Sequence, residues 1–188
     1  LLAENPEITE DVVKEVFQTI ETLERLTRLN KSLLLLSKIE NKQFLNDERI
    51  DFNELIGEVL EDFQDQIAFK ELELTVDTGG ELHATMNREL ARTLLSNLVK
   101  NAIRHNHKGG KIEVLITRSS FKVSNSGPGK ALNPDKVFQR FHKESADKSS
   151  TGLGLAIVKA AVKPEQFRSV YNPMFNVRVE QGAAVSPL

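Results

Sequence analysis

The stretch that decides the fold is Leu94-Leu95-Ser96-Asn97-Leu98-Val99-Lys100-Asn101-Ala102-Ile103-Arg104-His105-Asn106. Its apolar residues recur at steps of three and four, which predicts one buried stripe along an amphipathic helix. Asn97, Asn101 and Arg104 are also three and four apart, so they form a second, polar row on this helix. Carboxamide oxygens can bind a hard cation, and an arginine can pair with phosphate. The row is either a solvated face or a ledge for a magnesium-bound phosphate.

The composition is that of an ordinary globular domain with an appendage. The 188 residues include 28% charged and 39% hydrophobic residues, and the net charge of −2 makes nucleic acid an unexpected partner. There is no cysteine, which excludes disulfides, thiolate zinc sites and thiol nucleophiles. No apolar run approaches the roughly 20 residues that cross a bilayer. We expect a cytoplasmic fragment of a longer protein, since the chain begins at Leu1 without a methionine.

Residues 9–40 contain neither proline nor glycine and predict one long helix, which Thr9 can cap. Its apolar residues step mostly by three and four, with Thr27 and Asn30 as polar breaks, which is typical of an antiparallel helical bundle. The run Leu33-Leu34-Leu35-Leu36 is apolar on more than one face. This run is either buried on two sides, as in a four-helix dimer, or lies across its own domain.

Beyond a polar connector at 41–46, short strands and helices follow one another. Arg49 to Phe52 alternates like a strand, Asn53 can cap the next helix, and Asn87 can cap the central helix. Further strands are predicted at 72–76, 82–86, 111–118 and 121–124, and paired glycines at 79–80 and 109–110 turn the chain. Strands in one layer and helices in the other describe a two-layer α+β sandwich.

Two glycine clusters follow the central helix, Asn125-Ser126-Gly127-Pro128-Gly129 and Thr151-Gly152-Leu153-Gly154-Leu155. The first predicts a tight turn after a strand, where the backbone can approach a ligand, although a plain loop is the alternative. The second leads into an apolar helix at 156–162, and a glycine turn at a helix N-terminus forms an anion site. It is not a P-loop, because no Gly-Lys-Ser/Thr follows, and no strand precedes it as a dinucleotide fingerprint requires.

Between the glycine clusters lies Phe138-Gln139-Arg140-Phe141-His142-Lys143, followed by a polar run at 144–150. Such a run is typical of a mobile lid. The two phenylalanines would anchor the lid by burial, and ordinary core packing is the alternative reading of them.

In this order, the motifs resemble the N, G1, F and G2 boxes of the ATP-binding domain of sensor histidine kinases, and the resemblance covers residues 1–162. It implies the ATP-binding fold shared by histidine kinases, type II topoisomerases and mismatch-repair ATPases. It also implies two domains. Residues 1–42 would be the C-terminal part of the dimerisation and phosphoacceptor hairpin, whose Leu-Leu-x-Leu-Ser-Lys-Ile-Glu ending is matched by Leu34 to Glu40, and residues 43–188 the ATP-binding catalytic domain.

The resemblance also implies roles for single residues around bound ATP and Mg²⁺. Asn101 would hold the Mg²⁺, Asn97, Arg104 and His105 would line the phosphate side, and Lys143 would reach the γ-phosphate. The expected catalytic residues are Asn97, Asn101, Arg104 and Lys143. The other expected nucleotide contacts are Asn125, Gly127, Gly129, Phe141, Thr151, Gly152, Leu153, Gly154 and Leu155.

Asn125 departs from the family pattern, in which Asp usually accepts the adenine amino hydrogen. An amide oxygen can still accept this hydrogen bond but lacks the charge, so we expect adenine binding to persist and to weaken.

None of the four histidines lies in a His-Glu-x-x-x-Pro-like setting, so the phosphoacceptor is expected upstream of Leu1. The implied function is a histidine kinase core that passes phosphate to a response-regulator aspartate, working as a homodimer through its N-terminal helix. The full-length protein would lie in the inner membrane through segments absent from this chain.

One alternative is a degenerate kinase-like module that binds nucleotide or a partner without phosphotransfer. Another is an ATPase of the topoisomerase and mismatch-repair type, against which the long helix and the lack of a basic surface argue. The tail matches the family poorly: Pro164 ends the last helix, and only Phe175 to Val179 alternates like a strand.

Overall fold

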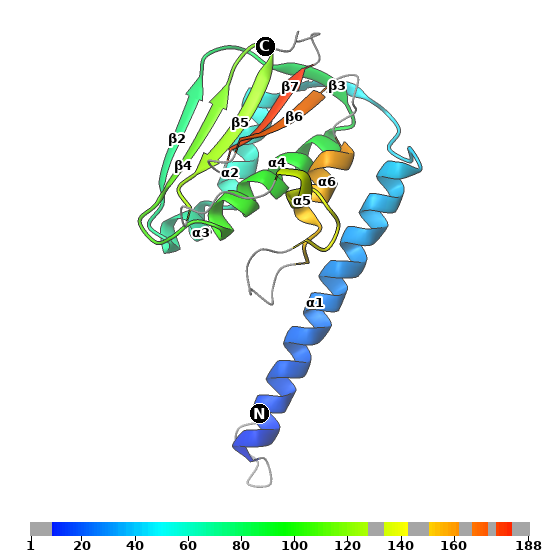
Figure 1. Cartoon of the computed structure of the whole chain (residues 1–188), viewed down its shortest axis with the longest axis vertical. Coiled ribbons are helices and arrows are strands. Elements are labelled where there is room, and N and C mark those ends of the chain that lie inside the picture. The colour runs from blue at the N-terminus through cyan, green and yellow to red at the C-terminus, as the bar shows by residue number, and fades with distance from the viewer. Residues whose placement is uncertain (1–8, 128–133, 143–150, 162–166, 173–175, 182–188) are drawn as a thin grey trace.

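The computed structural model describes residues 9–127, 134–142, 151–161, 167–172 and 176–181. A long N-terminal helix, α1, runs beside a domain in which helices pack against one face of a sheet (Figure 1). The predicted two-layer α+β fold is confirmed.

Helix α1 spans Glu10–Glu40 as predicted. The hydroxyl of Thr9 accepts a hydrogen bond from the Val12 N–H at 3.5 Å, and Glu10 and Asp11 lie in the first turn, where their charge suits the helix dipole. The helix ends at a cap formed by Asn41.

A small sheet follows, in which β1 (Glu48–Asp51) pairs antiparallel with β3 (His83–Met86). The prediction that Asn53 caps the next helix is wrong, because α2 (Phe52–Asp62) begins earlier and is capped by Asp51. The Asp51 carboxylate accepts from the Asn53 N–H at 2.8 Å, whereas the Asn53 side chain bonds to Gly80 and Leu82 across the domain. A short helix, α3 (Gln64–Phe69), follows α2.

The main sheet has five strands in the order β2-β4-β5-β7-β6. Strand β2 (Glu73–Thr78) runs parallel to β4 (Lys111–Ile116), and the other pairs are antiparallel: β4 with β5 (Ser120–Asn125), β5 with β7 (Asn176–Gln181), and β7 with β6 (Phe167–Asn172). Strand β6 was not predicted, because the sequence analysis recognised alternation in the tail only at 175–179.

The central helix α4 spans Arg88–Arg104, and the Asn87 side chain caps it by accepting from the Leu90 N–H at 3.1 Å, as predicted. Its predicted apolar stripe is buried in the core: Leu94, Leu95, Leu98, Ala102 and Ile103. The stripe packs in one cluster with the inward residues of β4 and β5, which include Val114 and Val123. Asn125 lies two residues beyond Val123 and therefore on the same, helix-facing side of β5.

Two short helices complete the described chain, α5 (Pro134–Val137) and α6 (Gly154–Ala161). Helix α6 packs against both α4 and α1, and its contact with α1 forms a second small core of Leu36, Leu153 and Ile157. Leu34, on another face of α1, is 57% exposed. The leucine run is therefore buried on the side that faces its own domain and open on the other.

Candidate nucleotide-binding site

Asn97 brings the central helix and the second glycine cluster together. Its amide N–H donates to the Thr93 carbonyl one turn earlier at 2.8 Å, which leaves its Oδ1 directed elsewhere. A Cβ placed on Gly154 would lie 3.1 Å from this Oδ1, so α6 can begin this close to α4 because its first residue is glycine.

Asn101 lies one turn further along α4 and is half-buried. Within the described part of the chain its carboxamide makes no hydrogen bond. A half-buried amide oxygen without a partner is a suitable ligand for Mg²⁺, which prefers oxygen donors. The geometry therefore fits the metal role that the sequence analysis expected, and Arg104 and His105 follow on the same helix.

The first glycine cluster begins at the C-terminal end of α4. The Asn125 amide N–H group donates to the His105 carbonyl at 3.5 Å and to the Ser126 carbonyl at 3.3 Å. The reverse orientation of the amide would place its oxygen against two carbonyl oxygens, which is repulsive. Among the described residues, no hydrogen-bond donor is therefore assigned to the Asn125 Oδ1, which can accept from a ligand.

A cluster of hydrogen-bonded polar groups, which we call the polar corner, lies beside this contact and is centred on Asn106. Asn106 is only 7% exposed, and its Nδ2 donates to the Lys111 carbonyl at 2.9 Å. Its Oδ1 accepts from the Ser126 hydroxyl at 2.9 Å and from the His107 N–H at 3.1 Å. A Cβ on Gly110 would lie 2.1 Å from this Oδ1, so the corner can close only around a glycine.

The second glycine cluster meets the segment around Phe141. Gly152 has φ +69°, in the left-handed region, and its carbonyl accepts from the Phe141 N–H at 2.9 Å. A Cβ on Gly152 would lie 2.8 Å from the Phe141 carbonyl carbon. Phe141 itself has φ +62° and a side chain that is 55% exposed, whereas Phe138 is half-buried. The expected anchoring by burial therefore applies to Phe138 and not to Phe141, whose turn directs the ring outward.

The N-terminus of α6 lies where the sequence predicts an anion site. The Leu153 carbonyl accepts the first intrahelical bond, from the Ile157 N–H at 2.9 Å. The N–H groups of residues 154–156 consequently have no partner inside the helix. Such groups, together with the positive end of the helix dipole, bind phosphate oxygens.

Lys70, at the end of α3, is a residue that the sequence analysis missed. Its ammonium donates to the carbonyls of Ile103 at 2.9 Å, Arg104 at 3.2 Å and Asn106 at 3.2 Å, which closes the C-terminal end of α4. No sequence motif indicates this role, because Lys70 is 33 to 36 residues away from its partners.

Not every expected residue can be placed. Gly129 and Lys143 lie outside the described residues, as does the predicted lid at 144–150. Gly127 and Thr151 are half-buried at the ends of their described segments, and Leu155 is half-buried in α6.

Residues 86–182 match the family described as histidine kinase-, DNA gyrase B-, and HSP90-like ATPase. This match covers more than half of the chain and includes α4 and both glycine clusters, and the chain belongs to this family as a catalytic ATPase domain of the sensor histidine kinase type.

Two relatives support the assignment of the chain to this family. The chain is 31% identical over 158 residues to the heme sensor protein HssS of Staphylococcus saprophyticus, with 80% of this chain and 33% of that protein aligned. It is 32% identical over 162 residues to the sensor histidine kinase RppB of Synechocystis, with 77% of this chain and 35% of that protein aligned. The chain thus spans about a third of the length of the relatives it matches.

Among solved structures, the histidine kinase AdeS of Acinetobacter baumannii superposes with a TM-score of 0.66 at 27% identity, over 92% of this chain and 83% of that one. The uncovered 8% of this chain contains fewer residues than α1, so the superposition includes at least part of the long helix. Among the described residues, no helix combines the length and the apolar character needed to cross a bilayer.

Proposed function

We propose that this chain is the catalytic core of a sensor histidine kinase, which binds Mg-ATP and transfers the γ-phosphate to a histidine upstream of Leu1. The observation that carries the proposal is the convergence of the motifs. Asn97 lies against Gly154, Asn125 lies against His105, and Gly152 lies against Phe141. These contacts join α4 to three later segments, the furthest of which is 57 residues from Asn97 in sequence.

Each end of ATP would meet a group suited to it. The free Oδ1 of Asn125 would accept a hydrogen bond from the adenine amino group. The N–H groups at the start of α6 would donate to phosphate oxygens. Asn101 would hold Mg²⁺, which when bound neutralises phosphate charge, and Arg104, His105 and Lys143 would act on the phosphate side. Catalysis would consist mainly of placement and charge stabilisation.

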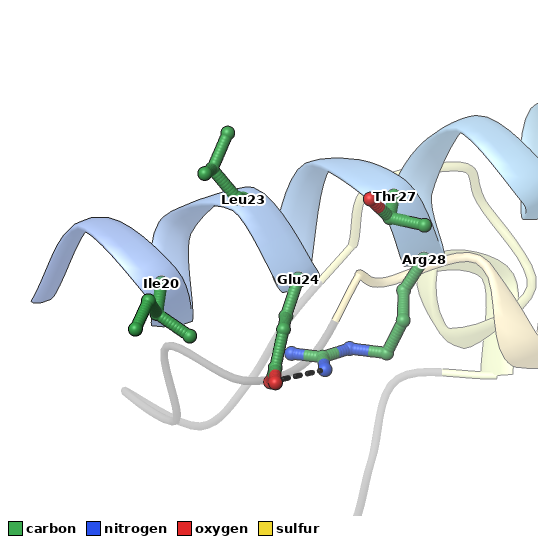
Figure 2. Close-up of a pocket in the computed structure, with 5 residues that line it drawn as sticks. All are labelled: Ile20, Leu23, Glu24, Thr27 and Arg28. Atoms are coloured by element: carbon green, nitrogen blue, oxygen red, sulfur yellow. Dashed lines mark hydrogen bonds and ion pairs between the residues drawn. The ribbon is translucent and has the colours of Figure 1, made fainter. Parts of the chain in front are cut away.

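The N-terminal helix is proposed to dimerise. Val16, Ile20 and Leu23 are four and three residues apart, and Leu34 follows eleven residues later, which is about three turns. These four residues lie on a face of α1 opposite Leu36, and all are exposed in this chain. A pocket of about 350 Å³ lies on α1. The residues that line it, shown in Figure 2, are Ile20, Leu23, Glu24, Thr27 and Arg28. Such a face is typical of a helical bundle, and we assign residues 1–42 to a dimerisation hairpin and 43–188 to the catalytic domain.

A receiver domain of a response regulator is the proposed acceptor of the phosphate after the histidine. The histidine kinase ThkA has been solved in complex with the response regulator protein TrrA, and it shares this fold at a TM-score of 0.66 and 24% identity. We place this chain in the cytoplasm and the full-length protein in the inner membrane, by analogy with sensor kinases. Nucleic acid is not an expected partner.

Binding and transfer need separate tests. The chain is titrated with a ribose-labelled fluorescent ATP analogue, with and without Mg²⁺, as the native sequence, as Asn101→Asp and as the control Asn46→Asp. Asn46 is exposed and lies outside the site. We expect Mg-dependent binding that Asn101→Asp alters and Asn46→Asp leaves unchanged. Without Mg²⁺, the added carboxylate of Asn101→Asp should weaken binding, because it repels the triphosphate.

Transfer is tested with a longer protein that includes the upstream helix, as the appearance of acid-labile phosphohistidine from ATP. Binding without transfer would favour the degenerate module. ATP turnover without phosphoprotein would favour an ATPase of the topoisomerase type.

A further inference from the structure

We propose that Lys70 is a positioning residue for nucleotide binding, which holds the C-terminal end of α4 so that Asn125 presents its oxygen to the base. The inference rests on the proposed function, in that Asn125 is taken to contact the base. Lys70 lies outside the four sequence motifs, and its contacts would explain why the site selects one base over another.

The carbonyls at the end of α4 are shared between two side chains. The last carbonyls of a helix have no intrahelical partners and must find others. The Lys70 ammonium donates hydrogen bonds to the carbonyls of Ile103, Arg104 and Asn106. The carbonyl left between them is that of His105, and it accepts from the Asn125 amide at 3.5 Å.

Lys70 is itself held in place. Its side chain is half-buried, and its own carbonyl accepts from the Gly109 N–H at 3.0 Å, in the turn that follows α4. The next residue, Glu71, pairs with Lys108 of the same turn at 2.8 Å. The ammonium also lies at the negative end of the α4 dipole, where a cation is stabilising. These contacts fix the lysine relative to the helix end, unlike a freely solvated surface lysine.

The consequence of losing the ammonium follows from the same geometry. The Ile103 carbonyl would keep the Asn106 N–H at 3.3 Å. The carbonyls of Ile103, Arg104 and Asn106 would nevertheless all lose the ammonium as a donor, and the last turn of α4 would fray more readily. The His105 carbonyl would then no longer fix the Asn125 amide. Only the Ser126 carbonyl, at 3.3 Å, would then oppose the reverse orientation of the amide, so the N–H group could face the ligand more often. An N–H group there would suit a base with a carbonyl at position 6 instead of an amino group. Lys70 therefore governs base selectivity as well as affinity.

The experiment is competition between the ribose-labelled ATP analogue and either ATP or inosine triphosphate, which carries a 6-carbonyl. Two variants change the lysine itself: Lys70→Met keeps the apolar stem, and Lys70→Arg keeps the charge and the donors. The control is Lys108→Met, at a lysine in the turn after α4 whose ammonium forms an exposed ion pair with Glu71. For Lys70→Met we expect ATP affinity to fall about fivefold and the preference for ATP over inosine triphosphate to shrink. Lys70→Arg should restore part of the preference, and Lys108→Met should behave as native.

A double-substitution cycle with Asn125→Ala separates positioning from general destabilisation. If Lys70 acts on the base through Asn125, Lys70→Met will not change the preference for ATP over inosine triphosphate any further in the Asn125→Ala background. Binding stoichiometry should stay at the native value, since loss of folded protein would lower stoichiometry instead of affinity. Additive effects of the two substitutions on the preference for ATP, or native selectivity in Lys70→Met, would overturn the inference while leaving the proposed function intact. Absence of ATP binding by the native chain would overturn both.

Discussion

Leu36 of α1 and Leu153 of the second glycine cluster are buried in one cluster, where they are 2% and 0% exposed. Leu153 lies between the two glycines of the proposed phosphate-binding turn, so this turn packs directly against the long N-terminal helix. At the surface, the ion pair between Arg140 and Glu40 joins α1 to the segment around Phe141, which contacts the same glycine turn at Gly152.

This packing predicts that Leu153→Ala lowers the free energy of unfolding by about 2–5 kcal/mol, the usual cost of truncating a buried leucine. Leu45→Ala, at a leucine that is 72% exposed, should change it by less than about 0.5 kcal/mol. Urea denaturation measures both. Equal stability of the two variants would mean that α1 does not dock on the glycine turn in solution.

The surface pair should matter little to stability. Glu40 and Arg140 are each about half exposed, and exposed ion pairs are generally worth about 0–1 kcal/mol. Glu40→Gln should therefore leave the urea midpoint nearly unchanged. A loss comparable with that of Leu153→Ala would contradict the assignment of the docking energy to the leucines.

Two glycines offer a matched test of the polar corner beside Asn125. Gly110→Ala would drive a methyl group into the Asn106 amide, and we expect it to destabilise by about 1–3 kcal/mol. Gly57→Ala, in α2 where nothing lies within 4 Å, should stabilise by about 0.5–1 kcal/mol. Thermal unfolding of the two variants should move the midpoint in opposite directions, and a shift in the same direction would refute the described geometry.

The free face of α1 should support dimerisation. Leu23→Lys places a charge in the proposed bundle, so we expect the dimer dissociation constant to rise about tenfold or more, whereas Leu45→Lys should not affect it. Sedimentation at several concentrations measures the constant. Unchanged association of Leu23→Lys would exclude this face as the interface.

Alkaline pH provides a test of the β2–β4 edge. The hydrogen bond from Lys111 to Glu73, and the charge of that carboxylate, raise the pKa of Lys111 above its ordinary value of 10.5. A raised pKa means that the pair's contribution is fully present below pH 10.5 and is lost as pH rises through the folded-state value. The thermal midpoint should thus fall less steeply above this pH in Lys111→Met than in the native chain. Identical pH profiles would show that the pair does not form.

The order of elements could largely be predicted because caps and periodicity are local. Thr9 and Asn87 cap the helices that their positions indicated. Asn53 does not cap α2, because Asp51, two residues earlier, accepts the same kind of bond and starts the helix sooner. The outward ring of Phe141 could not be foreseen, since its left-handed backbone depends on the distant contact with Gly152.

The candidate site was predictable to the extent that it lies in motifs. The polar row of α4 and both glycine clusters do come together, although the roles of these residues stay a prediction. Lys70 and Asn106 could not be found in this way. Their importance comes from hydrogen bonds between parts of the chain that are distant in sequence, from Lys70 to the end of α4 and from Ser126 to Asn106, which no spacing in the sequence encodes.

The most direct test of the account is the mapping of amide NMR shifts on titration of the chain with Mg-ATP. We predict large shifts along the polar row of α4 and at both glycine clusters, including Asn101, Asn125, Gly152 and Gly154, and small shifts in the first half of α1. Saturable shifts confined to α1, or no shifts at millimolar nucleotide in a folded chain, would contradict the assignment of the site.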